Sequence, residues 1–109
     1  MQVFAALADS TRAKIVEALA HRDLSAGEIA ERFPVSRPAV SRHLSVLRRA
    51  GLVRFKEDAQ RRIYSLNPQR LDEIDKWVAK CRRMWNQRLD NLERHLAEMV
   101  AQEREGGKR

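Results

Sequence analysis

Arginine and serine side chains recur in the segment Ser36-Arg37-Pro38-Ala39-Val40-Ser41-Arg42-His43-Leu44-Ser45-Val46-Leu47-Arg48-Arg49-Ala50-Gly51. At helical periodicity, one face of this segment carries Arg37, Ser41, Arg42 and Ser45. Arginine can bond guanine O6 and N7 through two N–H groups, and serine hydroxyls bond bases or phosphates. A helix with this face suits insertion into a DNA major groove. The alternative is a solvated surface helix of an ordinary small domain.

Start and stop signals support a helix over this segment. Ser36 can cap its first turn, Pro38 is tolerated there, and Gly51 fits the left-handed position beyond its end. An apolar stripe on the opposite side consists of Val40, Leu44 and Leu47. His43 lies on the same helix, where it could contact a phosphate or base, or form a hydrogen bond within the motif.

The excess positive charge is confined to this part of the chain. The net charge is +7, and residues 32–62 contain nine Lys or Arg against two acidic residues, whereas the rest carries thirteen of each sign. A basic excess in one structural unit is typical of a polyanion partner, because each neutralised phosphate releases a counterion. An anionic membrane would attract the same charge, but the segment lacks the bulky apolar face of an interfacial helix.

Three shorter helices are expected before the basic helix. Apolar positions indicate one over residues 2–8, and Asp9 or Ser10 caps a second that runs to about residue 20. A capping box of Ser25 and Glu28 opens a third helix, which ends near Phe33. Pro34 and Val35 then form the turn of a helix-turn-helix, in which the second helix enters the groove.

Two segments of alternating apolar and polar residues follow. Residues 52–56 and 62–66 each predict a strand with one buried face, and Glu57 to Arg61 link them as a hairpin. Arg61 and Arg62 would reach a minor groove or its phosphates from this hairpin. Because Asp58-Ala59-Gln60 contains no glycine, the tightest turns are disfavoured and we expect a longer or more mobile tip.

In this order, the segments resemble the winged helix-turn-helix of the ArsR/SmtB family of bacterial transcription regulators, over about the first two thirds of the chain. The matching residues are Phe4 to Arg12, Leu24 to Ala30, Val40 to Leu44 with Leu47, Ala50 to Val53, and Arg61 to Leu66. The resemblance implies a mainly α fold with a small β-hairpin. The residues expected at the DNA are Ser36, Arg37, Pro38, Ser41, Arg42, His43, Ser45, Arg61 and Arg62.

A long amphipathic helix is predicted from Pro68, since nothing breaks a helix before Gly106. Its apolar residues recur at spacings of three and four over more than three heptads. About 35 residues at 1.5 Å each give a helix near 50 Å long, which is longer than the small domain before it. Its apolar seam would therefore remain exposed to solvent unless another chain covered it. We therefore expect a homodimer, as the family forms, with the first helix packed against this one. The alternative is a helix folded back on its own domain. The residues expected at the dimer interface are Phe4, Leu71, Ile74, Trp77, Val78, Cys81, Trp85, Leu89, Leu92 and Leu96.

The chain of 109 residues predicts a single compact unit. We divide it into a DNA-binding domain at 1–67, a dimerisation helix at 68–105 in the same unit, and a disordered tail at 106–109. It has no apolar run of membrane-spanning length and no signal peptide, so we expect a cytoplasmic, nucleoid-associated bacterial protein. Its one cysteine, Cys81, excludes an intrachain disulfide. On the apolar seam this thiol is expected to be inert rather than a redox switch.

Many members of the family sense metals, but the ligands are not reproduced here. Ser25 and Gly27 occupy the positions of one Cys-x-Cys ligand pair. His95 and Glu98 match half of another site, but Met84 stands eleven residues before His95 where a histidine is needed, and Arg82 replaces the aspartate. We therefore expect no metal and no cofactor.

The leading hypothesis is a homodimeric, sequence-specific transcriptional regulator, most simply a repressor, that reads an inverted repeat in double-stranded DNA. A second is the same regulator with a small-molecule effector pocket near Trp77 and Trp85, although packing is the commoner role of such residues. A third is an architectural protein that binds nucleic acid without sequence preference. An enzyme is not expected, because no catalytic set or phosphate-binding glycine loop occurs.

Overall fold

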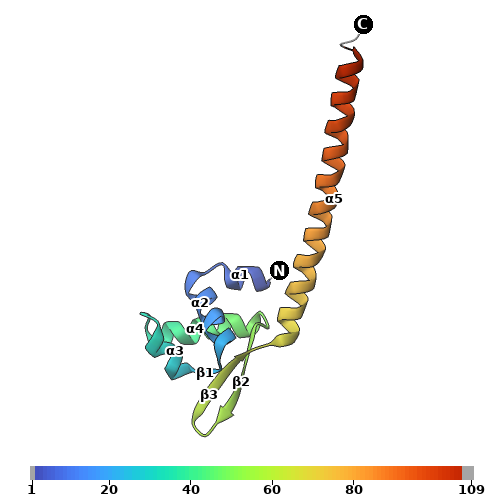
Figure 1. Cartoon of the computed structure of the whole chain (residues 1–109). Helices are drawn as coiled ribbons and strands as arrows, with labels where there is room; N and C mark the ends of the chain where they lie inside the picture. Colours follow the sequence, from blue (N-terminus) through green and yellow to red (C-terminus); the bar gives the residue numbers. More distant parts are fainter. Residues whose placement is uncertain (1, 107–109) are drawn as a thin grey trace. The chain divides into compact units, whose positions relative to one another are not determined.

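The computed structural model describes residues 2–106 (Figure 1), which fall into two compact units, the first ending at Asp72 and the second beginning at Glu73. The elements in chain order are α1 (Gln2–Leu7), α2 (Ser10–His21), β1 (Leu24–Ser25), α3 (Ala26–Arg32), α4 (Arg37–Arg49), β2 (Val53–Asp58), β3 (Arg61–Leu66) and α5 (Pro68–Gly106). Helix α5 includes Gly106, the first residue of the predicted tail, and residues 107–109 of that tail lie outside the described residues.

Three helices begin at side-chain caps that satisfy backbone N–H groups of the first turn. The Asp9 carboxylate accepts from Arg12 N at 3.0 Å at α2, and the Ser36 hydroxyl accepts from Ala39 N at 3.2 Å at α4. At α3, Ser25 and Glu28 form a complete capping box. These caps confirm the predicted starts of α2, α3 and α4, because capping depends only on neighbouring residues.

The core of the first unit lies between the helix-turn-helix and the sheet. Its largest fully buried side chains are Ile15, Leu24, Ile29, Val40, Leu44, Leu47 and Leu52. The predicted stripe of α4 is therefore buried, which leaves the opposite face of α4 exposed.

A three-stranded antiparallel sheet in the order β1-β3-β2 replaces the expected two-stranded hairpin. The additional strand, β1, pairs Leu24 with Tyr64 and Ser25 with Ile63. Two residues are too few to show an alternating pattern, and Ser25 had already been assigned as a helix cap. Ser25 both caps α3 and pairs with Ile63 of β3, and sequence periodicity cannot show this double role.

The β2–β3 hairpin is hereafter called the wing. Its tip differs from the expectation of a longer turn. Strand pairing continues to Asp58 and Arg61, so Ala59 and Gln60 alone form the turn. Ala59 adopts a left-handed φ of 57°. That conformation costs an L-residue about 1–2 kcal/mol. The pairing of all six residues in each strand offsets this cost, which is why the absence of glycine did not lengthen the turn.

Helix α5 is continuous from Pro68 to Gly106, as predicted, and none of its residues is buried. Its first turn is fixed by Asn67, whose Nδ2 donates to Gly51 O at 3.0 Å and whose Oδ1 accepts from Gln69 N at 3.2 Å. Gly51 has the left-handed φ of 78° expected beyond the end of α4. Among the described residues, no helix is long and apolar enough to span a bilayer.

Candidate nucleic-acid interface

The exposed face of α4 gathers most of the side chains predicted to contact DNA. Arg37, Ser41, Arg42 and Ser45 are all exposed, and Val40, Leu44 and Leu47 are buried on the opposite side. The hydroxyl of Ser36 caps the helix, and the exposed Pro38 lies in its first turn. Helix α4 therefore presents a row of donors on a rigidly packed backbone.

The structure also brings Arg62 of β3 to this helix. Arg37, Ser41 and Arg62 line a hollow of about 260 Å³ between α3, α4 and β3, whose floor includes Tyr64 and Leu44. Two guanidinium groups and a hydroxyl at one hollow form a suitable cradle for a phosphate. Arg61 is also exposed, but it precedes Arg62 in the strand and so points to the other face of the wing.

Phe55 makes two cation–π contacts, one with Arg48 of α4 and one with Arg62 of the wing itself. The guanidinium carbon of Arg48 lies 4.4 Å from the centre of the Phe55 ring, and that of Arg62 lies 4.5 Å from it. On the same sheet face, Phe55 pairs with Tyr64, with ring centres 5.5 Å apart. The Arg48 contact joins the wing to the end of α4.

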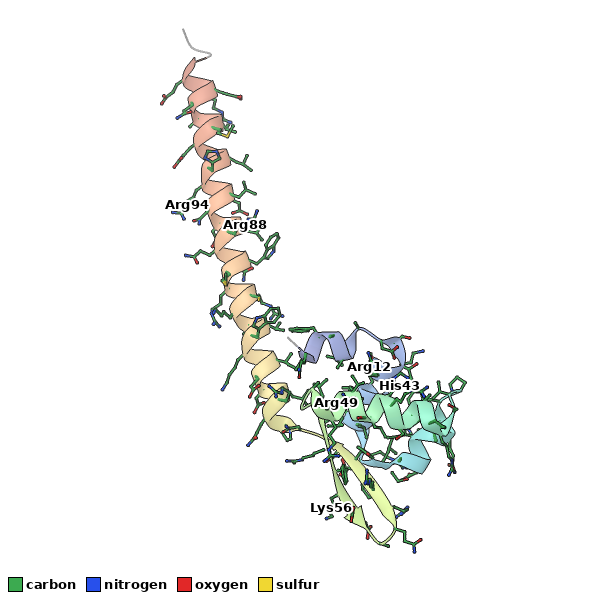
Figure 2. All side chains as sticks on the ribbon, turned by 180° about the vertical axis from the view of Figure 1, so that it is seen from behind. Arg12, His43, Arg49, Lys56, Arg88 and Arg94 are labelled. Carbon is green, nitrogen blue, oxygen red and sulfur yellow. The ribbon has the colours of Figure 1, made fainter. Side chains whose placement is uncertain are left out.

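Four basic residues at this surface were not singled out from the sequence as site residues. Arg48 and Arg49 extend the exposed face of α4, and Arg54 and Lys56 are exposed on β2. Lys56 is labelled on the wing in Figure 2. The available signal was the basic excess of residues 32–62, to which all four contribute.

His43 lies against α2 rather than on the exposed face of α4. Its Nδ1 is 3.3 Å from Arg12 Nη1 and 3.8 Å from the Asp9 carboxylate, and its side chain is 19% exposed. Because arginine has only donors, the closer contact requires Nδ1 to accept. The backbone N–H of Arg12 lowers the pKa of Asp9, and the nearby charge of the Arg12 guanidinium lowers it further. Of the two roles considered for His43, this geometry favours the hydrogen bond within the motif.

The predicted dimer residues of α5 form an exposed apolar seam. Trp85 is 56% exposed, and Leu92 and Leu96 are each 51% exposed. The remaining α5 residues predicted at the interface are partly buried or exposed: Leu71, Ile74, Trp77, Val78, Cys81 and Leu89. Phe4 of α1 is 37% exposed. Cys81 is a half-buried free thiol.

Within residues 2–106, no group of three or more His, Cys, Asp or Glu side chains is placed to hold a metal ion. The expectation of no metal stays a prediction. It would be contradicted by stoichiometric zinc that survives dialysis against a mild chelator.

A comparison with protein families matches residues 9–54 to the bacterial regulatory proteins of the arsR family. That stretch runs from the cap of α2 into β2 and therefore contains the helix-turn-helix.

Individual relatives extend the match. The HTH-type transcriptional regulator Rv2034 of Mycobacterium tuberculosis is 57% identical over 63 residues, which cover 58% of this chain and 59% of that protein. The transcriptional repressor SdpR of Bacillus subtilis is 40% identical over 76 residues, which cover 70% of this chain and 84% of the relative. The solved structure of an ArsR-like transcriptional regulator from Rhodococcus sp. RHA1 superposes with a TM-score of 0.76 at 33% identity, covering 85% of this chain and 88% of that one.

Proposed function

The chain belongs to the arsR family of bacterial regulatory proteins, and we propose that it is a homodimeric transcriptional repressor that reads an inverted-repeat operator in double-stranded DNA. The observation that carries the proposal is the exposed face of α4, where Arg37, Ser41, Arg42 and Ser45 stand opposite the buried stripe. In a helix-turn-helix, the second helix contacts base edges from this position.

We assign a role to each predicted residue. Arg42 and Ser45 face outward from the middle of α4, so we assign them to base edges, with Arg37 and Ser41 nearer the phosphate cradle that Arg62 completes. We assign Arg61, on the wing, to the phosphate backbone of the DNA. His43 positions α4 through Arg12 and makes no base contact.

Dimerisation is supported by the exposed seam of α5, which is too apolar to remain in water along its length. Two copies of α4 related by a two-fold axis would read half-sites about 34 Å apart in successive major grooves. Repression is supported by the name of the relative SdpR. A dimer bound to an operator represses by excluding polymerase, and this needs no catalytic group or cofactor. Such a protein acts at the nucleoid, in the cytoplasm.

Selection from a random duplex pool tests the proposal. The enriched duplex is then compared with scrambled DNA by fluorescence anisotropy at two salt concentrations. We expect an inverted repeat bound about a thousandfold more tightly than scrambled DNA. Equal, salt-sensitive binding to every duplex would instead indicate an architectural protein.

Replacement of Arg42 tests the role of α4 itself. If Arg42 bonds a guanine bidentately, Arg42→Ala weakens operator binding by about 1–3 kcal/mol and relaxes base preference at one position in each half-site. The matched control is Arg94→Ala, which removes the same charge from α5 (Figure 2) and is expected to leave the operator affinity unchanged. Equal effects of the two variants would remove Arg42 from the DNA contact.

A further inference from the structure

An open cavity between α1 and α4 shares only Arg49 with the proposed DNA surface. Its volume is about 320 Å³, which lies at the lower end of the range for small-molecule sites. The apolar part of its lining consists of Ala5, Ala6, Val46 and Ala50. A wall of this kind receives the hydrocarbon part of a small organic molecule.

The polar part of the lining is positively charged. It consists of Arg12, Arg49 and Gln2, and none of the aspartates or glutamates among residues 2–106 lines the cavity. Asp9, whose carboxylate accepts from the backbone N–H of Arg12, is not part of the lining. Two guanidinium groups beside an apolar wall suit a ligand with an anionic head and an apolar body.

Arg12 is held in place at this wall by bonds to two other elements. Its Nε donates to Ala6 O of α1 at 2.6 Å, and its Nη1 lies 3.3 Å from Nδ1 of His43 in α4. Figure 2 shows Arg12, His43 and Arg49 between α1 and α4. A ligand at Arg12 would therefore meet a preorganised charge and would not have to order a mobile side chain.

Arg49 belongs to both the cavity and the DNA surface. Its side chain lines the cavity, yet its Nη2 donates to Ser45 Oγ at 3.3 Å on the exposed face of α4. On a helical wheel, Arg49 falls between Ser45 and the cavity-lining Val46. The Arg49 guanidinium cannot bind an anion in the cavity and a phosphate of DNA equally strongly at the same time.

We propose that this cavity binds a small organic carboxylate with an apolar body, held by Arg12 and Arg49. Binding draws Arg49 away from Ser45 and weakens DNA binding. The ligand site stands on the cavity alone, whereas its effect on DNA rests on the proposed function. The inferred effector site therefore consists of residues of the DNA-binding unit and includes neither Trp77 nor Trp85.

Calorimetric titration of the DNA-free protein tests the site. The probes are octanoate and benzoate, which distinguish an aliphatic from an aromatic acid, with octanol and inorganic phosphate as controls that lack either the charge or the apolar body. We expect saturable binding of one carboxylate per protomer. No saturable binding of either acid, or equal binding of octanol or phosphate, would overturn the proposal.

Three variants locate the binding. Arg49→Gln is expected to weaken carboxylate binding at least tenfold, and the matched Arg94→Gln is expected to leave it unchanged. Because Arg49 is exposed, its replacement should not disturb the fold. Ala5→Phe fills the cavity from an exposed position of α1 and should abolish binding while the melting temperature is retained. Carboxylate binding that survives Arg49→Gln and Ala5→Phe would place the ligand elsewhere.

The effect on DNA is measured separately, as operator affinity with and without saturating carboxylate. We expect a three- to tenfold loss of affinity, absent in Arg49→Gln. Unchanged affinity at saturation would overturn the coupling. A protein that binds octanoate in the cavity but selects no DNA sequence would overturn the proposed function and leave the ligand site standing.

Discussion

Gly51 joins the end of α4 to the sheet, and a methyl group added there would meet two obstacles. Its φ is 78°, and an added Cβ would lie 2.7 Å from Arg70 Nε. The Arg70 side chain is flexible and can move aside, so the left-handed backbone sets most of the cost. For an L-residue this cost is about 1–2 kcal/mol.

Replacing each of the two glycines within the DNA-binding unit by alanine should therefore change the free energy of unfolding in opposite directions. Gly51→Ala is expected to lower the free energy of unfolding by about 1–2 kcal/mol. Gly27→Ala should raise it by about 0.5 kcal/mol, because Gly27 is helical and an added Cβ would meet only Ser25 Oγ at 3.9 Å. Urea titration of both variants measures the difference. A shift of both in the same direction would contradict this account.

Single residues also show where prediction from sequence stops. Arg42 and Ser45 were placed correctly on the exposed face, because helical periodicity determines which side chains share a face. The same periodicity places His43 on α4 but cannot show that Arg12, 31 positions earlier, lies 3.3 Å from it. Contacts between distant residues depend on packing, which a single sequence does not display.

Among the elements, the seam of α5 determines the oligomeric state that we propose. Leu92→Asp places a charge on the exposed apolar stripe, and burying that charge in a dimer would cost several kcal/mol. Sedimentation equilibrium should then show a monomer for this variant and a dimer for the wild type. Arg94→Asp, which alters a charged position two residues away, should remain dimeric. A dimeric Leu92→Asp would exclude this part of the seam from the interface.

The capping box of α3 predicts a dependence of stability on pH. The N–H and hydroxyl of Ser25 lower the pKa of Glu28 from its usual 4.5, and Arg22, at 2.9 Å, lowers it further. A lowered folded-state pKa means that the carboxylate stabilises the fold above pH 4.5. This contribution is lost as the pH falls through the lower folded-state value.

Glu28→Gln should therefore melt below the wild type at pH 7, and the two should converge as the pH falls through the lowered folded-state pKa of Glu28. Thermal melts across this range measure the difference. Glu17→Gln removes the same charge from an exposed position of α2 and provides the control. A gap between Glu28→Gln and the wild type that does not narrow as the pH falls below 4.5 would assign the effect to something other than the charge.

Elements with local signals were predictable, and elements set by their partners were not. Ser25 and Ser36 mark helix starts because each cap bonds within three residues. Ala59 adopts a left-handed conformation that alanine disfavours, because the six residue pairs between β2 and β3 outweigh that cost. Strand β1 exists only because β3 lies beside it.

For the whole molecule, charge and symmetry together determine the response to salt. Each phosphate neutralised on duplex DNA contributes about −0.9 to the slope of log K against log salt. A two-fold dimer doubles every contact, so Arg61→Ala should make the slope shallower by about 2. Arg94→Ala should leave it unchanged. An unaltered slope in Arg61→Ala would remove the tip of the wing from the DNA backbone.

The charged side chains of the wing have a second consequence, for solubility. Within residues 2–106, β2 pairs with β3 alone, so its other edge presents backbone N–H and C=O groups without a neighbouring strand. An unpaired edge is a template for another chain unless charged side chains discourage the approach. The alternate positions Arg54, Lys56 and Asp58 provide such charges. Neutralising the wing would therefore promote strand-to-strand aggregation, whether or not the protein meets DNA.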